Sequence, residues 1–394
     1  MPTQIAIAFS QAPDAQDAVY QAAITAKRQL NSDDTDLVLL LASGAYAGAE
    51  TCDVIHSILR PRRLVGACAA GLILAEGSFN HGIALLAVNS DEISFASATA
   101  HSPAQNNFRN AGFELGRKLN ADFKAPQRQA CLLFTDLLFQ NDTQFIRGAQ
   151  EVLGLGFPLV GAVGNSNTKA YPDCQFYQKK MLTQSAVGLL IGGANIGIGN
   201  KHGFKPLGKP RTVTKSQDNL ILTIDQRPAF HIYEEFLGPE AEKMRGGITS
   251  LHPLLYPLGI YMEEQRQYLI KNAVDILPNG SIVCQGEVRE GAEVHLMIGG
   301  RDSCVKSAVE AAHQVKNTLG TNPAKLIIII ESAARHKILK NEVFMEIQAI
   351  RDILGYPVPL IGMYTGGEIT PLGPGYGINN THMQNESIVI LGLG

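Results

Sequence analysis

The sequence predicts an α/β protein built from repeated strand–helix units, with mixed and mostly parallel sheets arranged in two domains. Two observations carry this prediction. Short apolar segments of strand length alternate along the chain with longer segments whose apolar residues recur at helical spacing. In addition, a short apolar segment that runs into glycine occurs three times, at residues 63–71, 158–164 and 359–369. Self-similarity of this kind indicates a duplicated supersecondary unit.

The elements of each unit follow from the spacing of the apolar residues. Residues 36–42 form a continuous apolar run, which is typical of a strand buried on both faces of a sheet. Residues 14–30 instead place their apolar side chains on one helical stripe. In chain order, the first unit is predicted to contain a strand at 4–9, a helix at 14–30, a strand at 36–42, a helix at 50–59 and strands at 63–67 and 82–88.

The same order of elements recurs in two later parts of the chain. Alternating strands and helices favour parallel pairing with right-handed crossovers. The last strand of each unit follows a loop too short for a helix, so this strand is free to run antiparallel and mixed sheets are expected. The second unit is predicted at 92–98, 107–119, 130–135, 143–153, 159–163 and 186–191, and the third at 293–298, 303–319, 325–331, 341–354, 359–363 and 386–391.

A segment of different character, about residues 201–291, separates the second and third units. It opens with Gly203, Pro206, Gly208 and Pro210, a composition that predicts a linker. Strands are then expected at 219–225, 267–272 and 281–285, and a helix at 228–237. The domain boundary is placed near residue 205, which gives predicted domains of residues 1–205 and 206–394.

Composition restricts the class of partner and the compartment. The net charge is −3 and the pI is about 6.4, so no basic surface is expected that would attract nucleic acid or anionic lipid. The N-terminus lacks the features of a signal peptide, and the longest apolar runs are interrupted by glycine before they reach the length of a membrane span. A cytoplasmic protein with a small-molecule ligand is therefore expected.

The six cysteines are far apart and include no C-x-x-C pair. Cys68, Cys131, Cys284 and Cys304 lie in or beside apolar segments. Their placement favours buried free thiols over a disulfide framework or a zinc site.

Polar groups gather in the last of the three repeated segments, where two predicted strands end. In an open α/β sheet, ligands bind outside the carboxyl ends of the strands. Arg335 follows one strand and is suited to grip a ligand carboxylate, and Glu368 follows the next and is suited to take an ammonium group. The predicted ligand-binding positions in this segment are Arg335, Tyr364, Thr365, Gly367 and Glu368.

Other interpretations of these residues stay open. Arg335 and Glu368 are equally compatible with a solvated surface or with an ion pair to each other. A hydrolase or transferase would use Glu368 as a base and Cys304 or Ser332 as a nucleophile, but no histidine is positioned to activate either nucleophile. Catalytic signatures are largely absent, and residues 197–199 lack the spacing of a dinucleotide-binding loop and are predicted to form an ordinary loop. A protein without catalytic residues is expected.

Several segments resemble the FIST family of sensory proteins. Residues 213–229, 256–260, 268–272 and 362–371 are similar to the family's C-terminal domain, and residues 36–43, 64–66 and 82–88 are similar to its N-terminal domain. The resemblance covers nearly the whole chain and is specific as a set of motifs. Family members often carry a His-Asn pair before the last strand, where this chain has Gln384 and Asn385. Asn385 is therefore added to the predicted ligand-binding residues.

The resemblance implies an intracellular module that binds a small ligand and signals through a partner protein. The ligand is expected to be an amino acid or a similar small metabolite, bound without a cofactor at the edge that carries Arg335, Thr365, Glu368 and Asn385. The alternative that the family implies is a nitric-oxide sensor that binds haem b and regulates a histidine kinase or a cyclic-di-GMP enzyme. The histidines are scattered and C-x-x-C-H is absent, so no haem ligand is identified.

Overall fold

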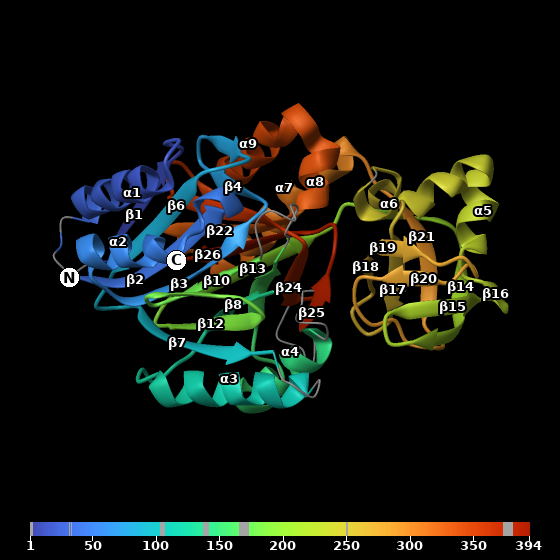
Figure 1. Ribbon diagram of the computed structural model, residues 1–394, viewed down its shortest axis with the longest axis horizontal. Helices are drawn as coiled ribbons and strands as arrows, with labels where there is room; N and C mark the ends of the chain where they lie inside the picture. The colour runs from blue at the N-terminus through green and yellow to red at the C-terminus, as the bar shows by residue number, and fades with distance from the viewer. Residues whose placement is uncertain are drawn as a thin grey trace.

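A computed structural model of the chain consists of a large body and a smaller lobe (Figure 1). The structure describes residues 3–394 except 31, 33, 103–106, 137–141, 165–172, 250 and 373–380. Three six-stranded sheets form the body, and one eight-stranded sheet forms the lobe. The predicted α/β class with mixed sheets and two domains is confirmed. Within the described residues, no helix is both long enough and apolar enough to cross a membrane.

The first body sheet shows the arrangement that the others repeat. Strands β2 and β3 pair in parallel, β6 pairs antiparallel with β2, and β1 pairs antiparallel with β6. The antiparallel last strand is as predicted. The elements of this unit are β1 (Gln4–Ser10), α1 (Ala15–Leu30), β2 (Thr35–Ser43), α2 (Ala49–Leu59), β3 (Pro61–Ala69) and β6 (Ile83–Asn89).

The second and third units repeat this arrangement of strands and helices. The second contains β7 (Ser94–His101), α3 (Phe108–Asp122), β8 (Ala130–Thr135), α4 (Asp142–Leu153), β9 (Leu159–Val163) and β12 (Ser185–Gly192). The third contains β13 (Ile196–Lys201), α7 (Arg301–Leu319), β22 (Leu326–Ser332), α8 (Ala333–Leu339), α9 (Val343–Leu354), β23 (Leu360–Thr365) and β26 (Ile388–Leu393). In each unit the two central strands are parallel and the last strand is antiparallel.

The three units are interlocked by an exchange of hairpins. After its second parallel strand, each unit sends a hairpin into the sheet of another unit. The hairpins are β4 (Gly71–Leu74) with β5 (Gly77–Phe79), β10 (Gln175–Tyr177) with β11 (Lys180–Leu182), and β24 (Gly367–Pro371) with β25 (Thr381–Gln384). Strand β4 pairs with β23, β10 with β3, and β24 with β9. The turn at Gly366 is therefore the crossover from the third sheet to the second.

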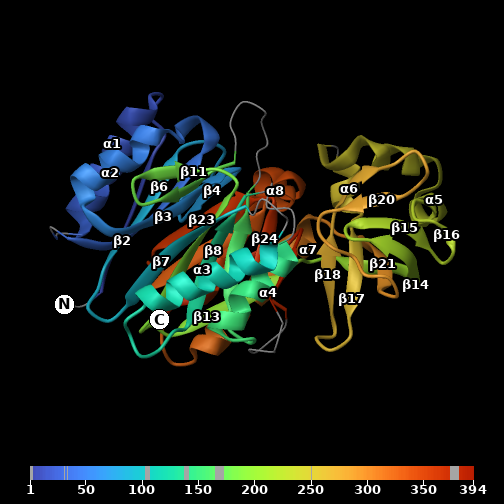
Figure 2. The same cartoon turned by 60° about the horizontal axis from the view of Figure 1, so that its bottom comes forward.

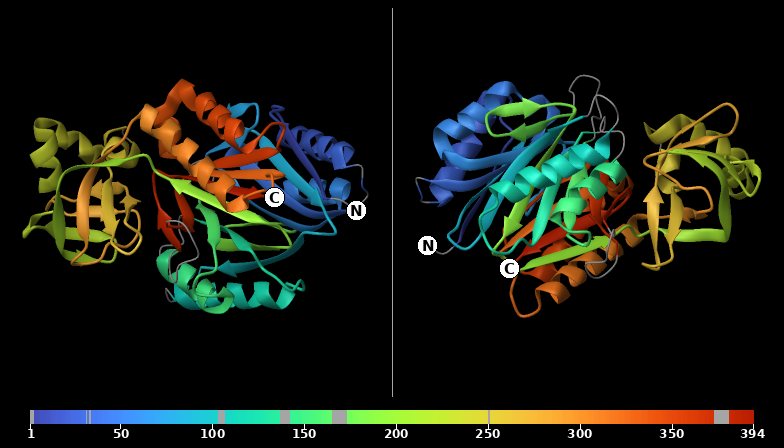
Figure 3. Two further views of the ribbon diagram at one scale, coloured as in Figure 1. Left: turned by 180° about the vertical axis from the view of Figure 1, so that it is seen from behind. Right: turned by 90° about the horizontal axis from the view of Figure 1, so that it is seen from below.

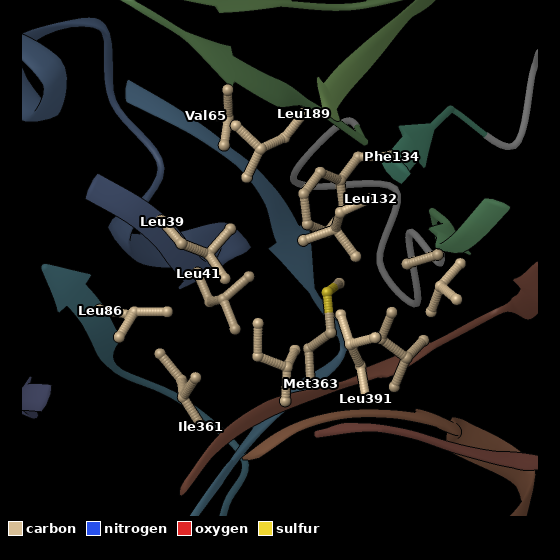
Figure 4. Close-up of a cluster of buried hydrophobic side chains, with 14 of the residues drawn as sticks. Leu39, Leu41, Val65, Leu86, Leu132, Phe134, Leu189, Ile361, Met363 and Leu391 are labelled. Carbon is tan, nitrogen blue, oxygen red and sulfur yellow. The ribbon is translucent and has the colours of Figure 1, made fainter. Parts of the chain in front are cut away.

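The inner faces of the three sheets share one apolar core. Because side chains alternate between the faces of a strand, one set points inward and the other packs under helices. Helices α1 and α2 cover the first sheet, and α3 and α4 cover the second (Figure 2). Helices α7 and α9 cover the third sheet (Figure 1). Figure 4 shows inward side chains of all three sheets: Leu39, Leu41, Val65, Leu86, Leu132, Phe134, Leu189, Ile361, Met363 and Leu391.

The repeated glycine of each unit lies within a strand. Gly66, Gly161 and Gly362 stand opposite Leu40, Leu133 and Ile329 in the three parallel pairs. A Cβ at any of these glycines would lie 1.9–2.5 Å from the carbonyl oxygen of the opposite residue. All three glycines fall inside strands predicted from the sequence, at residues 63–67, 159–163 and 359–363, and the close approach of the two backbones requires glycine there.

The predicted loop at residues 197–199 is wrong, because these residues belong to β13. Strand β13 pairs with β26 and takes the place that β1 holds in the first sheet. A Cβ at Gly199 would lie 1.9 Å from the carbonyl oxygen of Ala311, and one at Gly197 would lie 2.7 Å from that of Val315. The two glycines thus let α7 pack directly on the strand.

The lobe is an insertion between β13 and α7 (Figure 3). Its elements are β14 (Lys205–Gln217), β15 (Leu220–Ile224), β16 (Arg227–Pro228), α5 (His231–Leu237), α6 (Leu251–Leu255), β17 (Leu258–Met262), β18 (Gln267–Lys271), β19 (Ala273–Ile276), β20 (Ile282–Cys284) and β21 (Glu293–Ile298). The chain enters the lobe at Lys205, the position of the predicted domain boundary. The division into residues 1–205 and 206–394 stays a prediction.

Two sequence-based expectations for the lobe differ from the structure. Strand β21 was expected to open the third unit, but it pairs with β14 and β17 in the lobe sheet. The residues expected to form a linker belong to β14, whose register shifts between Leu207 and Arg211. That irregularity contains Gly208, with a φ of +75°, and Pro210, so the strand tolerates both residues.

Cys68 and Cys174 form a disulfide with a Cα–Cα distance of 5.3 Å. The expectation of a free thiol is wrong for Cys68, because the hairpin exchange brings β10 and the residue before it beside β3. The expectation is confirmed for Cys131, Cys284 and Cys304, which are free and buried.

Reduction of this disulfide is expected to lower the free energy of unfolding by about 2–4 kcal/mol, because the bond closes a long loop in the unfolded chain. The two cysteines are separated by 106 residues. Urea unfolding with and without reductant measures the change. The Cys174→Ser variant is the control: it should unfold like the reduced protein and show no response to reductant. Equal stability of oxidised and reduced wild type would contradict the prediction.

Candidate functional site

A cluster of buried polar side chains lies around the carboxyl ends of β22 and β23 and on β24. Strands β24 and β25 lie on the side of the body that faces the lobe (Figure 1). Four carboxyl groups belong to the cluster, and each residue is at most 2% exposed. The carboxylic residues are Glu331, Glu346, Glu368 and Glu386, and the cationic residues are Arg335 and Lys271. Acidic groups therefore outnumber basic groups in a region that excludes water.

Arg335 is fully buried and binds two of these carboxyl groups. Its Nε donates to Glu331 at 3.0 Å, and its Nη2 donates to Glu346. The remaining donors reach the carbonyl oxygens of His202 and Cys304 and the Oγ of Ser307, at 3.0–3.1 Å. A guanidinium has five N–H groups, and five protein acceptors surround this one.

Arg335 therefore has no free N–H group with which to bind a ligand carboxylate, the role expected from the sequence. Nor does Arg335 form an ion pair with Glu368, as the alternative interpretation required; its partners are Glu331 and Glu346. Glu331 lies four residues earlier, at the end of β22, and Glu346 comes from α9. The ion pairs thus fix α8 and α9 against the strand that leads into the cluster.

The two carboxyl groups bound by Arg335 share one balancing charge. Burial and the neighbouring Glu346 raise the pKa of Glu331 well above its ordinary value, against the opposing effect of Arg335. These surroundings therefore favour the protonated form of Glu331. The group of three is then close to neutral, which is the arrangement a buried ion pair requires.

Glu368 lies on β24 and is fully buried. Its Oε2 accepts hydrogen bonds from the backbone N–H and the hydroxyl of Ser387, at 3.1 and 2.8 Å. Among the described residues, its Oε1 has no hydrogen-bond partner. Burial raises the pKa of Glu368 well above its ordinary value, and this outweighs the lowering by Ser387.

Glu386 is the functional candidate that sequence reasoning missed. It is fully buried, its φ is +57°, and neither carboxyl oxygen has a hydrogen bond of normal geometry to a described residue. Burial raises its pKa to about 8, although Asn272, Arg335 and Lys337 act in the opposite direction. The available signal was a carboxylate next to Asn385 at the start of an apolar strand.

Asn385 and Gln285 join the lobe to the body at this cluster. The side-chain Oδ1 of Asn385 accepts the backbone N–H of Asn272 at 3.1 Å, and its backbone N–H donates to the carbonyl oxygen of Ile270. The side-chain amides of Gln285 and Asn385 both donate to the carbonyl oxygen of Gly366, at 2.7 and 3.3 Å. The crossover turn between two body sheets is thus held by one amide from the lobe and one from the body.

The other predicted site residues surround this turn. The Thr365 hydroxyl lies 2.7 Å from the carbonyl oxygens of Val163 and Gly367, so it ties the crossover to β9. Gly367 is covered by both amides, since a Cβ there would lie 3.4 Å from each nitrogen. The Tyr364 ring is buried against the His336 ring, with 4.6 Å between centroids. All six predicted residues therefore belong to or border one buried cluster.

The two candidate nucleophiles lie in structural environments. Cys304 is buried, and burial raises the pKa of its thiol to about 11. The Ser332 hydroxyl accepts the backbone N–H of Ala334 at the start of α8. Neither side chain forms a hydrogen bond to a described histidine, and within the described part of the chain no three His, Cys, Asp or Glu residues form a metal-binding group.

Histidines do not present a clear haem ligand among the described residues. The Nδ1 of half-buried His202 accepts the backbone N–H of Phe204, and the loss of solvent around this imidazole lowers its pKa to about 4. His231 lines a cavity in the lobe, but its two ring nitrogens already lie within hydrogen-bonding distance of Arg227 and Glu234. Haem binding stays a prediction, which a Soret band in the purified protein would test.

Comparison with protein families matches two adjoining parts of the chain. The FIST N domain matches residues 36–227, and the FIST C domain matches residues 229–371. The border between the two matches falls inside the lobe, just after β16, whereas the boundary predicted from sequence lies near residue 205. Together the matches cover most of the chain, including Arg335 and Glu368, whereas Asn385, Glu386 and strand β26 lie beyond the end of the second match.

Similar proteins of known sequence are uncharacterized. One from Mycobacterium tuberculosis is 23% identical over 403 residues, which cover 98% of this chain and 99% of the relative. One from Methanocaldococcus jannaschii is 25% identical over 231 residues, or 55% of this chain and 43% of the relative. Among solved structures, a cyanuric acid hydrolase from A. caulinodans aligns over 99% of both chains, with 6% identity and a TM-score of 0.40.

Proposed function

Because the chain belongs to the FIST family, whose domains are associated with sensing of small ligands in signal transduction, we propose that it is a cytoplasmic small-ligand sensor. The proposed ligand is an amino acid or a similar small metabolite that carries an ammonium group. The output passes through a signalling partner such as a histidine kinase. The ligand is assigned to the buried cluster at the junction of body and lobe.

The unpaired carboxyl oxygens of Glu368 and Glu386 carry this proposal. A buried polar atom without a partner is unfavourable by about 1–3 kcal/mol, and more when it is charged. Glu368 Oε1 and both carboxyl oxygens of Glu386 have no hydrogen bond of normal geometry to a described residue, although the Asn272 side chain lies close enough to lower the pKa of Glu386. An ammonium group has three donors and no acceptor, so it satisfies these oxygens and balances their charge.

The amides of the same cluster supply the complementary donors. A side-chain amide has two N–H donors. The side-chain nitrogens of Gln285 and Asn385 each donate one hydrogen bond to the carbonyl oxygen of Gly366. The second N–H of each is suited to a ligand carboxylate, a role for which Arg335 has no free donor. In this proposal Arg335 is a positioning residue that holds Glu331 and Glu346.

The position of the cluster links binding to the arrangement of the lobe. Hydrogen bonds from Asn272 and Gln285 connect the lobe to Asn385 and Gly366 of the body. A ligand that enters between them exchanges these contacts for its own and shifts the balance between two lobe positions. A ligand changes such a balance only through its different affinity for the two states.

An amino-acid and amine panel in a thermal-shift assay tests the proposal. A bound ligand at 100 times its Kd should raise the free energy of unfolding by about 2.7 kcal/mol. The Glu386→Gln and Glu368→Gln variants should lose this stabilisation, because an amide does not balance an ammonium charge. Glu342→Gln is the matched control, since Glu342 pairs with Arg301 at the surface.

Two outcomes would reject the assignment. In one, no amino acid or amine stabilises the wild-type protein. In the other, both cluster variants respond to the ligand as strongly as Glu342→Gln does.

A further inference from the structure

A second cavity lies at the end of the body remote from the lobe, among the three sheets. Its volume is about 390 Å³, and Thr3 and Gly394 lie at its edge. Figure 1 shows both chain termini at this end of the body. The walls come from all three sheets and include Leu37, Val88, Leu132, Ile191, Leu326 and Leu393. The cavity therefore continues the inward-facing apolar surface of the central core.

The core fills the rest of this inner space with larger side chains. Farther along the strands, Phe134, Met363 and Leu391 belong to the apolar core between the three sheets (Figure 4). Protein interiors normally leave few voids larger than a water molecule. The lining also includes Gln127, Gln129 and Asn195. The part of the wall made of Leu, Ile and Val does not offer a water the partners it needs, and surfaces of this kind bind apolar molecules. Its volume lies near the lower end of the range for small-ligand sites.

The edge of the cavity is polar and carries one cation without an acidic partner. Lys325 lines the edge, is exposed to solvent and forms no ion pair with any described residue. The acidic group at the same edge, Glu92, accepts a hydrogen bond from the Thr3 hydroxyl at 3.2 Å. Apolar walls with a cation at the opening suit a molecule with an aliphatic chain and an anionic head.

We propose that this cavity binds a medium-chain aliphatic carboxylate, with the chain among the three sheets and the carboxylate at Lys325. Its volume is too small for a folded peptide segment. None of the residues that line it is a histidine, an arginine or a cysteine. This site is separate from the polar cluster and does not depend on the function proposed for that cluster.

Calorimetric titration with decanoate, decanol and decylamine tests the proposal. Val88→Phe and Ala194→Phe place a ring into the cavity from two different elements, and each should weaken decanoate binding at least about tenfold. Lys325→Gln should weaken decanoate about two- to fivefold and leave decanol unchanged, since it removes only an exposed ion pair. Val54→Phe, on α2 outside the cavity, is the control and should bind decanoate like wild type.

The melting temperatures of the same variants keep the test decisive. A phenylalanine that fills an existing void leaves the melting temperature unchanged or raises it. A steep fall in both filled variants would show that the space is not there and would overturn the proposal. Decanoate binding that survives both substitutions, or decylamine that binds as tightly as decanoate, would overturn it equally.

Discussion

Replacing Arg335 with methionine is expected to lower the free energy of unfolding by about 3–5 kcal/mol, because it leaves buried carboxyl groups without their cation. Glu331 and Glu346 are at most 2% exposed, so water cannot replace the guanidinium. The carbonyl oxygens of His202 and Cys304 lose a donor as well. Urea unfolding monitored by circular dichroism measures the change.

Arg301→Met is the matched control for this substitution. Arg301 also binds a glutamate, Glu342, at 3.0 Å, but its side chain is 46% exposed. Exposed pairs contribute about 0.2–1 kcal/mol, so the control should lose far less stability. Adding Glu331→Gln and Glu346→Gln to Arg335→Met should recover part of the loss. Equal losses for Arg335→Met and Arg301→Met would show that the buried group is not a stabilising element.

The repeated units could be predicted from sequence because their signal is local. Apolar runs and helical stripes at residues 14–30 and 36–42 report the burial of each element without reference to its neighbours. The antiparallel last strand also followed from a local property, the short loop before it. Register and strand order are not local, so the exchange of hairpins among the three sheets left no trace that periodicity detects.

The errors share one physical cause, which is contact between distant segments. In the sequence Gly199 resembles a loop residue. Its role in the strand depends on α7, which is more than a hundred residues later and packs directly against it. Cys174 becomes the partner of Cys68 only because a hairpin of the second unit joins the first sheet. Proline breaks strands in general, but the irregular register of β14 between Leu207 and Arg211 accommodates Pro210.

The residues predicted to bind a ligand lie together in the structure, and their role as a binding site stays a prediction. In open α/β sheets, ligands bind outside the carboxyl ends of the strands. This rule drew attention to the end of β23 and the residues at that end, which are Tyr364, Thr365, Gly367 and Glu368. The role expected for Arg335 did not allow for Glu346, which has the spacing of an ordinary polar residue on an amphipathic helix. Its burial depends on how α9 packs, and that packing is not encoded at residue 346 alone.

Replacing Glu386 with glutamine is expected to stabilise the protein at pH 8 and to have little effect near pH 4.5. The pKa of this buried carboxyl is about 8 in the folded protein, against an ordinary value of 4.5. Between these values the folded state holds a proton that the unfolded state has released, so wild-type stability falls as pH rises. The full difference is on the order of 3–5 kcal/mol, and glutamine removes it because an amide does not ionise.

Urea unfolding of wild type and Glu386→Gln at pH 5, 6, 7 and 8 measures this difference. The raised pKa values of Glu331 and Glu368 act in the same direction in both proteins and largely cancel in the comparison. Exposed Glu342→Gln provides the control, for which the difference from wild type should stay constant with pH. A constant difference for Glu386→Gln as well would contradict the raised pKa.

The same titration distinguishes the proposed ligand from other small molecules. An ammonium group beside Glu386 favours the ionised carboxylate, so binding should release a proton whenever the free site is protonated. Ligand affinity should therefore rise with pH up to about 8, which is the pKa of Glu386 in the folded protein, and then level off. Titration in two buffers of different ionisation enthalpy would detect the released proton. A ligand that binds with no proton release at pH 6 would have to occupy the cluster without pairing with Glu386.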